Sequence, residues 1–182
     1  MIGDRPSQGA ADNAAGVAVV LWVASQLKAD ADAGRLSVPV VVALFGAEES
    51  GLVGSRQFAA ALTHAKCPIA KPLKMINVDA IGGGKDRTIY VIGRSHHAEL
   101  FDALSPHLEK RGFKIGRDID KFAFPLGSDH WPLHQAGVPA VTLFGTNYRT
   151  MNTLADTRER VDVSYLRDAA RAVYRTIREM AK

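Results

Sequence analysis

The chain has a single cysteine, Cys67, among its 182 residues. One cysteine excludes an intrachain disulfide and a metal site built from thiolates, so we interpret Cys67 as a loop residue outside any site. No run approaches the roughly 20 apolar residues of a membrane span, and we expect no membrane partner. The opening residues, MIGDRPSQGAADN, lack the basic and then apolar pattern of a signal peptide, so localisation stays open.

The sequence also lacks internal repeats, low-complexity tracts and linkers. Its length and its hydrophobic content of 47% predict a single domain over residues 1–182 with a real core. The net charge is only +4, and the arginines of the C-terminal segment alternate with acids. That alternation is typical of a solvated helix face, so we expect no nucleic-acid partner.

Helical and strand-like apolar patterns alternate along the chain. Helical spacing covers residues 12–33, 51–64, 100–108 and 163–180, the last being the clearest amphipathic pattern. Short β-rich runs cover residues 38–45, 74–78, 88–92 and 140–144. This alternation predicts an α/β fold, a three-layer α/β/α sandwich with a mostly parallel central sheet.

Four acids occupy equivalent places in this pattern. Asp12 lies where a loop enters a helix, Glu48 and Glu49 follow the strand predicted at 38–45, and Asp79 ends the next strand. Because the carboxyl ends of parallel strands open onto one crevice, these carboxylates should meet there. Adjacent carboxylates repel each other unless cations neutralise them, so the pattern predicts a metal cluster.

Each acid also has a simpler interpretation. Asp12 could cap a helix. Glu48 and Glu49 could favour the positive end of the helix that follows them. Asp79 could close a turn after its strand.

Two other chemistries are weaker. Ser128, Asp129 and His130 are consecutive, whereas the members of a serine-hydrolase triad are distant in sequence, and no G-x-S-x-G elbow is present. The glycines at 82–84 lack the spacing of a nucleotide-binding loop. We interpret four further histidines as surface residues without ligand spacing, namely His64, His96, His97 and His107.

Five blocks in order resemble the co-catalytic zinc aminopeptidases, metallopeptidase family 28, which also contains glutamate carboxypeptidases and related glutaminyl cyclases. They are GAADNAAGVA (9–18), GAEESGLVGS (46–55), INVDAIG (76–82), SDHWPLHQAGVPAVTLF (128–144) and NTLADTRERVD (152–162). The resemblance covers nearly the whole chain. It implies a zinc-exopeptidase-like fold, two zinc ions and peptide substrates.

The resemblance also implies a role for each acid. Asp12 resembles the aspartate that bridges the two zinc ions, Glu49 a ligand of one zinc and Asp79 a ligand of the other. Glu48 resembles the general base that takes a proton from the attacking water, a role that suits a carboxylate beside the metals. Asp129 and His130 match a block that supports the site without ligating.

Two departures from the family pattern concern histidine. Family members carry a His-x-Asp block before the bridging aspartate, but none of the eleven residues before Asp12 is histidine. We therefore expect a chain that lacks its N-terminal strand or strands and forms the C-terminal part of a larger domain. Asn152 stands where the last histidine ligand should be. His130 or His134 could substitute, although neither occupies the family position.

An all-oxygen donor set suits Mg²⁺, Mn²⁺ or Ca²⁺ better than Zn²⁺. We therefore expect weak zinc binding and reduced activity in a metal-dependent aminopeptidase. One alternative is a catalytically inactive peptidase-like domain kept for binding, and another is an acyltransferase of the glutaminyl-cyclase type. An unpaired sheet edge would further predict self-association.

Overall fold

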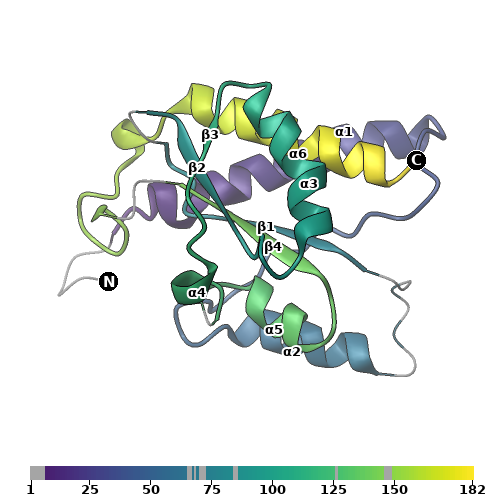
Figure 1. The fold of residues 1–182 in the computed structure, drawn as a ribbon. Helices are drawn as coiled ribbons and strands as arrows, with labels where there is room; N and C mark the ends of the chain where they lie inside the picture. The colour runs from purple at the N-terminus through teal and green to yellow at the C-terminus, as the bar shows by residue number, and fades with distance from the viewer. Residues whose placement is uncertain are drawn as a thin grey trace.

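A computed structural model describes residues 7–64, 67, 69, 73–83, 86–125, 127–145 and 149–182. The predicted alternation of helices and strands is present over most of this range (Figure 1). In chain order the elements are η1 (Ala10–Ala15), α1 (Gly16–Asp32), α2 (Val53–Thr63), β1 (Met75–Asp79), β2 (Thr88–Ile92), α3 (Ala98–Glu109), β3 (Lys114–Ile115), α4 (Asp120–Ala123), α5 (His130–Gln135), β4 (Ala140–Phe144), η3 (Arg158–Arg160) and α6 (Val163–Met180).

The described strands form one mixed sheet in the order β1-β4-β2-β3. β1 pairs with β4 in parallel and β2 with β3 in parallel, whereas β2 and β4 are antiparallel. The sheet is therefore mostly parallel, as the sequence predicts. Asp79 is in register with Phe144, so the carboxyl ends of β1 and β4 lie side by side. This edge of the sheet carries the site described below.

Helices cover both faces of the sheet (Figure 1). α1, α3 and α6 lie on one face and α2, α4 and α5 on the other. The larger core joins the first group to the strands, and α6 buries Tyr165, Ala169 and Val173 in it. α6 begins where the pattern predicts because Asp162 caps it, accepting hydrogen bonds from the backbone N–H groups of Ser164 and Tyr165. A smaller core lies between α2 and α5.

The prediction of a strand at residues 38–45 is wrong. The segment is neither helix nor strand, and within the described residues no backbone hydrogen bond joins it to a neighbouring strand. Its apolar side chains are about half exposed, namely Val38, Val41, Val42 and Leu44. The sequence has the β propensity of a buried strand, but a strand forms only against a partner that accepts its backbone hydrogen bonds.

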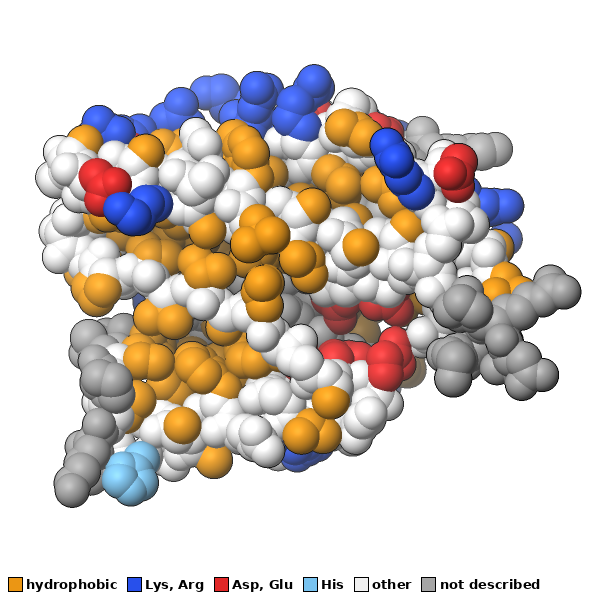
Figure 2. Space-filling model, turned by 180° about the vertical axis from the view of Figure 1, so that it is seen from behind, with side chains coloured by type: hydrophobic (Ala, Val, Ile, Leu, Met, Phe, Trp, Pro, Cys, Tyr) orange, Lys and Arg blue, Asp and Glu red, His pale blue; other side chains and the backbone are white. Residues whose placement is uncertain are grey.

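The unpaired segment adjoins α1 across an apolar groove of about 530 Å³. Leu27 and Ala31 of α1 line one side, and residues 36–40 and 42 line the other. Figure 2 shows apolar side chains spread across the middle of this back face. The stretch Ala10–Asp32 is long and apolar enough to cross a membrane, with a mean hydropathy of 1.3. Core helices share that property, and α1 here packs against β1 and α6.

Candidate functional site

Three separate parts of the chain bring the predicted acids together. Asp12 lies in η1, Glu48 and Glu49 lie in the loop before α2, and Asp79 ends β1. The charges of Asp79 and Glu49 both act on Asp12 and on Glu48, so the four carboxyl groups share one electrostatic neighbourhood. Figure 2 shows acidic side chains gathered around a hollow on the back face. We refer to Asp12, Glu48, Glu49 and Asp79 as the acid cluster.

Asp12, Glu48 and Asp79 of the acid cluster hold protons more tightly than isolated carboxyl groups would. Burial raises the pKa of Glu48 to about 7, and repulsion from Asp79 and then Glu49 adds to the effect. Burial likewise raises the pKa of Asp12 to about 6, with further contributions from Asp79 and Glu49. A divalent cation would reverse this repulsion. With a pKa near neutrality, Glu48 can both accept and release a proton at physiological pH.

Two hydrogen bonds in series hold Asp79 in place. The Ser128 hydroxyl donates to Oδ2 of Asp79 at 2.6 Å, and Nδ2 of Asn77 donates to the Ser128 hydroxyl at 2.8 Å. Burial raises the pKa of Asp79, while the hydrogen bond from Ser128 lowers it. Sequence reasoning assigned no role to Ser128 or Asn77. The available signal was the spacing of Asn77 and Asp79, which places both on one face of β1.

Asp156 anchors the turn that carries Asp12. Its buried carboxylate accepts hydrogen bonds from the backbone N–H of Ala11 at 2.7 Å and of Asp12 at 3.1 Å. Asp12 itself has backbone angles outside the helical region, with φ −120° and ψ 92°. Asp156 thus fixes a backbone that η1 alone would not hold. Sequence reasoning missed this role because 144 residues separate the two aspartates.

Asn13 ties the same turn to the end of β1. Its side-chain Nδ2 donates to the carbonyl of Val78 at 3.0 Å, and its Oδ1 accepts from the N–H of Ala80 at 3.3 Å. Gly16 permits this approach, because a Cβ there would lie 2.1 Å from Oδ1 of Asn13 and 2.6 Å from the Val78 carbonyl. Asp12 and Asp79 are therefore coupled through the backbone.

The two predicted supporting residues lie in different surroundings. Asp129 is beside the acid cluster, where its charge contributes to the raised pKa values of Glu48 and Asp79. Burial raises the pKa of Asp129 itself, and a hydrogen bond from Ser55 lowers it. His130 is fully buried, and its Nε2 donates to the carbonyl of Phe124 at 2.8 Å. Burial lowers the pKa of His130 to about 4, so the ring is neutral.

Asn152 is exposed and has a left-handed backbone, with φ 52°. Within the described part of the chain, no hydrogen bond joins its side chain to the acid cluster. Its neighbour Thr153 accepts a hydrogen bond from the Ser7 hydroxyl at 3.0 Å, which keeps this loop near the start of η1. A ligand role for Asn152 therefore stays a prediction.

The donor chemistry of the acid cluster fits oxygen-preferring cations. Its members offer carboxylates, and their mutual repulsion adds to the effect of burial on the pKa values of Asp12 and Glu48. Among the residues that the structure describes, no three or more Asp, Glu, His or Cys side chains are arranged to hold a metal ion. In the described part of the chain, no imidazole joins the four carboxylates, and these are not arranged as a formed metal site. Carboxylate oxygens suit Mg²⁺, Mn²⁺ or Ca²⁺ better than a pair of zinc ions with histidine ligands.

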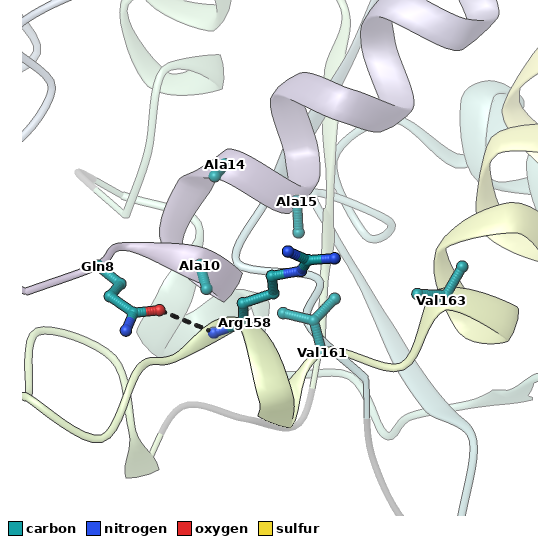
Figure 3. A pocket seen from close by; sticks show the side chains of 7 residues that line it. All are labelled: Gln8, Ala10, Ala14, Ala15, Arg158, Val161 and Val163. Carbon is teal, nitrogen blue, oxygen red and sulfur yellow. Dashed lines mark hydrogen bonds between the residues drawn. The ribbon is translucent and has the colours of Figure 1, made fainter.

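A separate pocket of about 400 Å³ lies between η1 and the start of α6 (Figure 3). Alanine and valine side chains line it together with Gln8 and Arg158, whose backbone N–H donates to Oε1 of Gln8 at 3.1 Å. None of its lining residues belongs to the acid cluster. We assign it no role in the chemistry.

Comparisons with known proteins match nearly the whole chain to one family model and to several solved structures. The family model described as peptidase family M28 matches residues 2–177. The structure is similar to BSAP, a zinc aminopeptidase from Bacillus subtilis, with 25% identity, a TM-score of 0.71, and coverage of 98% of this chain and 44% of that one. LapB from Legionella pneumophila gives a TM-score of 0.80 at 20% identity, covering 98% and 49% of the two chains.

A glutaminyl cyclase from Porphyromonas gingivalis shares the fold, with a TM-score of 0.68 at 19% identity, covering 97% of this chain and 65% of that one. No curated protein matches the chain in sequence. The chain spans less than half the length of the Bacillus aminopeptidase that it matches.

Proposed function

The chain belongs to peptidase family M28, and we propose that it is a metal-dependent exopeptidase, an aminopeptidase of reduced activity that removes N-terminal residues from peptides. The observation that supports this most is the meeting of Asp12, Glu48, Glu49 and Asp79 in one electrostatic neighbourhood. Nothing in the simpler interpretations of the single acids requires them to meet. We also infer that the helices on both faces of the sheet form the outer layers of a three-layer α/β/α sandwich.

In this proposal the residues have separate roles. Asp12, Glu49 and Asp79 hold divalent cations, with Asn152 at a degenerate ligand position. A bound cation supplies a water of lowered pKa and polarises the scissile carbonyl. Glu48 takes the proton from the attacking water and delivers it to the leaving amine, for which a pKa of about 7 is suited. Ser128 and Asp156 orient Asp79 and the Asp12 backbone.

Reduced activity follows from the donor set. An amide oxygen at Asn152 is a poorer zinc ligand than an imidazole, because zinc favours nitrogen and sulfur donors. We therefore propose that zinc binds weakly and that Mg²⁺, Mn²⁺ or Ca²⁺ binds instead. If no cation supports hydrolysis, the same features favour a catalytically inactive domain that binds peptides. A cyclase-type acyltransferase is a further candidate and would need an imidazole ligand for its single zinc ion.

Hydrolysis of a leucyl anilide by metal-dialysed protein, with each cation added back, tests the proposal. We expect slow hydrolysis that Mn²⁺ stimulates and that Glu48→Gln lowers at least about 100-fold, because a general base contributes about 10²–10⁴-fold. Glu48→Gln should still bind Mn²⁺. The matched control, Glu109→Gln, changes an exposed carboxylate in α3 and should leave the rate unchanged. Equal rates in wild type and Glu48→Gln would contradict the proposal, and no hydrolysis with any cation would favour the binding domain.

We further propose that the chain self-associates through the unpaired segment at residues 38–45. The segment carries exposed apolar side chains and backbone groups that have no strand partner among the described residues, and a second copy offers the same two features. Two such segments can satisfy each other's backbone groups by pairing as strands. The charge of the segment is zero, so no repulsion opposes this pairing.

A further inference from the structure

Three histidines meet on the side of the sheet where α5 lies. Two of them are neighbours in one turn, and the third is distant in the chain. His96 and His97 occupy the turn between β2 and α3, and His134 lies in the last turn of α5. The Nε2 atom of His97 is 3.0 Å from the Nδ1 atom of His134. The ring of His96 lies with its centroid 5.9 Å from that of His134. We call His96, His97 and His134 the imidazole cluster.

The sequence predicted that His96 and His97 are surface residues without ligand spacing, and it offered His134 as a substitute for a missing zinc ligand. His96 is indeed exposed, but His97 and His134 are only half exposed and face each other. Sequence spacing missed the pair because 37 residues separate its members. None of the three lies in the acid cluster, and the proposed peptidase chemistry does not use them.

Aromatic packing fixes the orientation of the rings. His96 stacks on Phe124 with ring centroids 4.2 Å apart and planes 12° apart. His134 packs edge-on against Phe124, with ring centroids 4.8 Å apart, and stacks against the indole of Trp131 at 5.4 Å. These contacts restrict the rotation of the imidazoles before any ligand arrives. Less conformational entropy is then lost on binding.

The turn that carries His96 and His97 is also held rigidly. Asp120 is buried, and its carboxylate accepts hydrogen bonds from the Gly93 N–H at 2.7 Å and from the Ser95 N–H at 2.8 Å. The N–H of His97 in turn donates to the Gly93 carbonyl at 2.8 Å. The turn is thus anchored at both ends, so the position of His97 relative to α5 is defined.

Both facing histidines are neutral at neutral pH. Burial lowers the pKa of His97, and the neighbouring His134 and His96 lower it further, against a smaller opposite effect of Asp120. Burial also lowers the pKa of His134, and the neighbouring His96 lowers it further. Neutral imidazole is the form that ligates metals. In the present arrangement one ring N–H donates to the other ring nitrogen, and each ring has a second nitrogen that can carry the proton instead.

We propose that the imidazole cluster is a second metal site, selective for a divalent transition-metal ion such as Ni²⁺, Cu²⁺ or Zn²⁺. The facing Nε2 of His97 and Nδ1 of His134 are the ligands, with solvent at the open positions and His96 at the edge of the site. On binding, His97 carries its proton on Nδ1 and His134 on Nε2, so no net proton is released. Imidazole nitrogens suit these ions and discriminate against Mg²⁺ and Ca²⁺.

Calorimetric titration of metal-dialysed protein with Ni²⁺ tests this site apart from the acid cluster. The background variant is Glu49→Gln/Asp79→Asn, which removes two carboxylate ligands. We expect one equivalent of Ni²⁺ to bind, and His97→Gln or His134→Gln to weaken the binding at least tenfold. Ca²⁺ should not compete. The matched control is His107→Gln, which alters a histidine of α3 that contacts Glu179 instead.

Nitrogen-15 spectra of the imidazole rings provide a second measurement that needs no substitution. Substoichiometric Ni²⁺ should broaden the resonances of His97 and His134 first and leave His107 sharp. Absence of Ni²⁺ binding would overturn the proposal. Equal affinity in His134→Gln and His107→Gln, or broadening that favours other histidines, would overturn it as well. None of these results depends on peptidase activity.

Discussion

At the scale of single residues, the proposed chemistry depends most on the protonation of the Glu48 carboxyl group. It must be unprotonated to accept a proton and close enough to a neutral pKa to release it again. Burial and the charges of Asp79 and Glu49 provide this by raising its pKa to about 7. The same repulsion destabilises the folded protein when no cation is present. Function and stability are therefore opposed at this position.

The pH dependence of stability should reveal that opposition. Glu48 has a higher pKa in the folded state than its ordinary value of 4.5. Its contribution to stability is therefore fully present below about pH 4.5 and is lost as pH rises through about 7. Without metal, we expect the free energy of unfolding to fall over this window, and to fall less in Glu48→Gln. Urea unfolding in a chelator at pH 5 and pH 8 measures this, and parallel curves for the two proteins would contradict it.

Adding Mn²⁺ extends the same experiment. The cation neutralises ionised carboxylates, so it should stabilise the wild type more at pH 8 than at pH 5. Asp12, whose pKa is raised to about 6, titrates inside the same window and contributes with the same sign.

The acids of the site were predictable from sequence, but their supporting contacts were not. Asp79 was predicted from the end of a strand that forms and Asp12 from the entry to a helix, whereas the strand predicted before Glu48 and Glu49 does not form. Ser128 and Asp156 act through hydrogen bonds to Asp79 and Ala11, which lie 49 and 145 positions away along the chain. Such pairs become neighbours only through the packing of the sheet and helices, which no local pattern encodes.

At the scale of elements, α6 and the strand at residues 38–45 show when local patterns succeed. α6 has its own signals, an amphipathic repeat and the cap at Asp162, and both act within a few residues. A strand depends on a partner for its backbone hydrogen bonds. Residues 38–45 have the composition of a buried strand but no such partner in the described chain. The composition was interpreted correctly as apolar and β-rich, and the pairing could not be predicted.

The start of α1 provides a test at this scale. Replacing a helical glycine by alanine usually stabilises a helix by about 1 kcal/mol. Gly16→Ala should have the opposite effect, because the new Cβ would overlap Asn13 and the Val78 carbonyl. We expect a loss of about 1–3 kcal/mol in the free energy of unfolding, the usual range for overpacking. The control is Ser25→Ala, at an exposed position of the same helix.

Chemical denaturation of the two variants measures the difference. Gly16→Ala should also weaken Mn²⁺ binding, since Asn13 adjoins Asp12 and ties it to β1. A Gly16→Ala protein as stable as wild type, or more stable, would show that η1 and β1 do not approach as closely as described.

At the scale of the whole molecule, an exposed apolar face lies beside an acidic hollow (Figure 2). α1 contributes Leu21 and Trp22 to the exposed apolar surface, and the unpaired segment contributes Val42 and Leu44. Monomeric proteins rarely leave such a surface uncovered. The Bacillus aminopeptidase and LapB are about twice as long as this chain. The molecule thus contains all four carboxylates of the acid cluster and leaves much apolar surface exposed.

Self-association should follow from that face. We expect light scattering to give a mass above the monomer value of 19.6 kDa, increasing with protein concentration. Leu44→Lys places a charge on the unpaired segment and should restore the monomer. Gln57→Lys adds the same charge at an exposed position of α2 and should not. A monodisperse wild-type monomer at high concentration would contradict the proposed pairing.

The central claim is that the acid cluster binds cations through oxygen donors and lacks the imidazole that zinc requires. Calorimetric titration of metal-dialysed His134→Gln protein, which removes the imidazole cluster, with Mn²⁺ and Zn²⁺ tests it most directly. We predict that Mn²⁺ binds, that Zn²⁺ gains no advantage over it, and that adding Asn152→His raises zinc affinity at least tenfold. Tight binding of two zinc ions to the protein that keeps Asn152, with the same affinity after Asn152→His, would contradict the account.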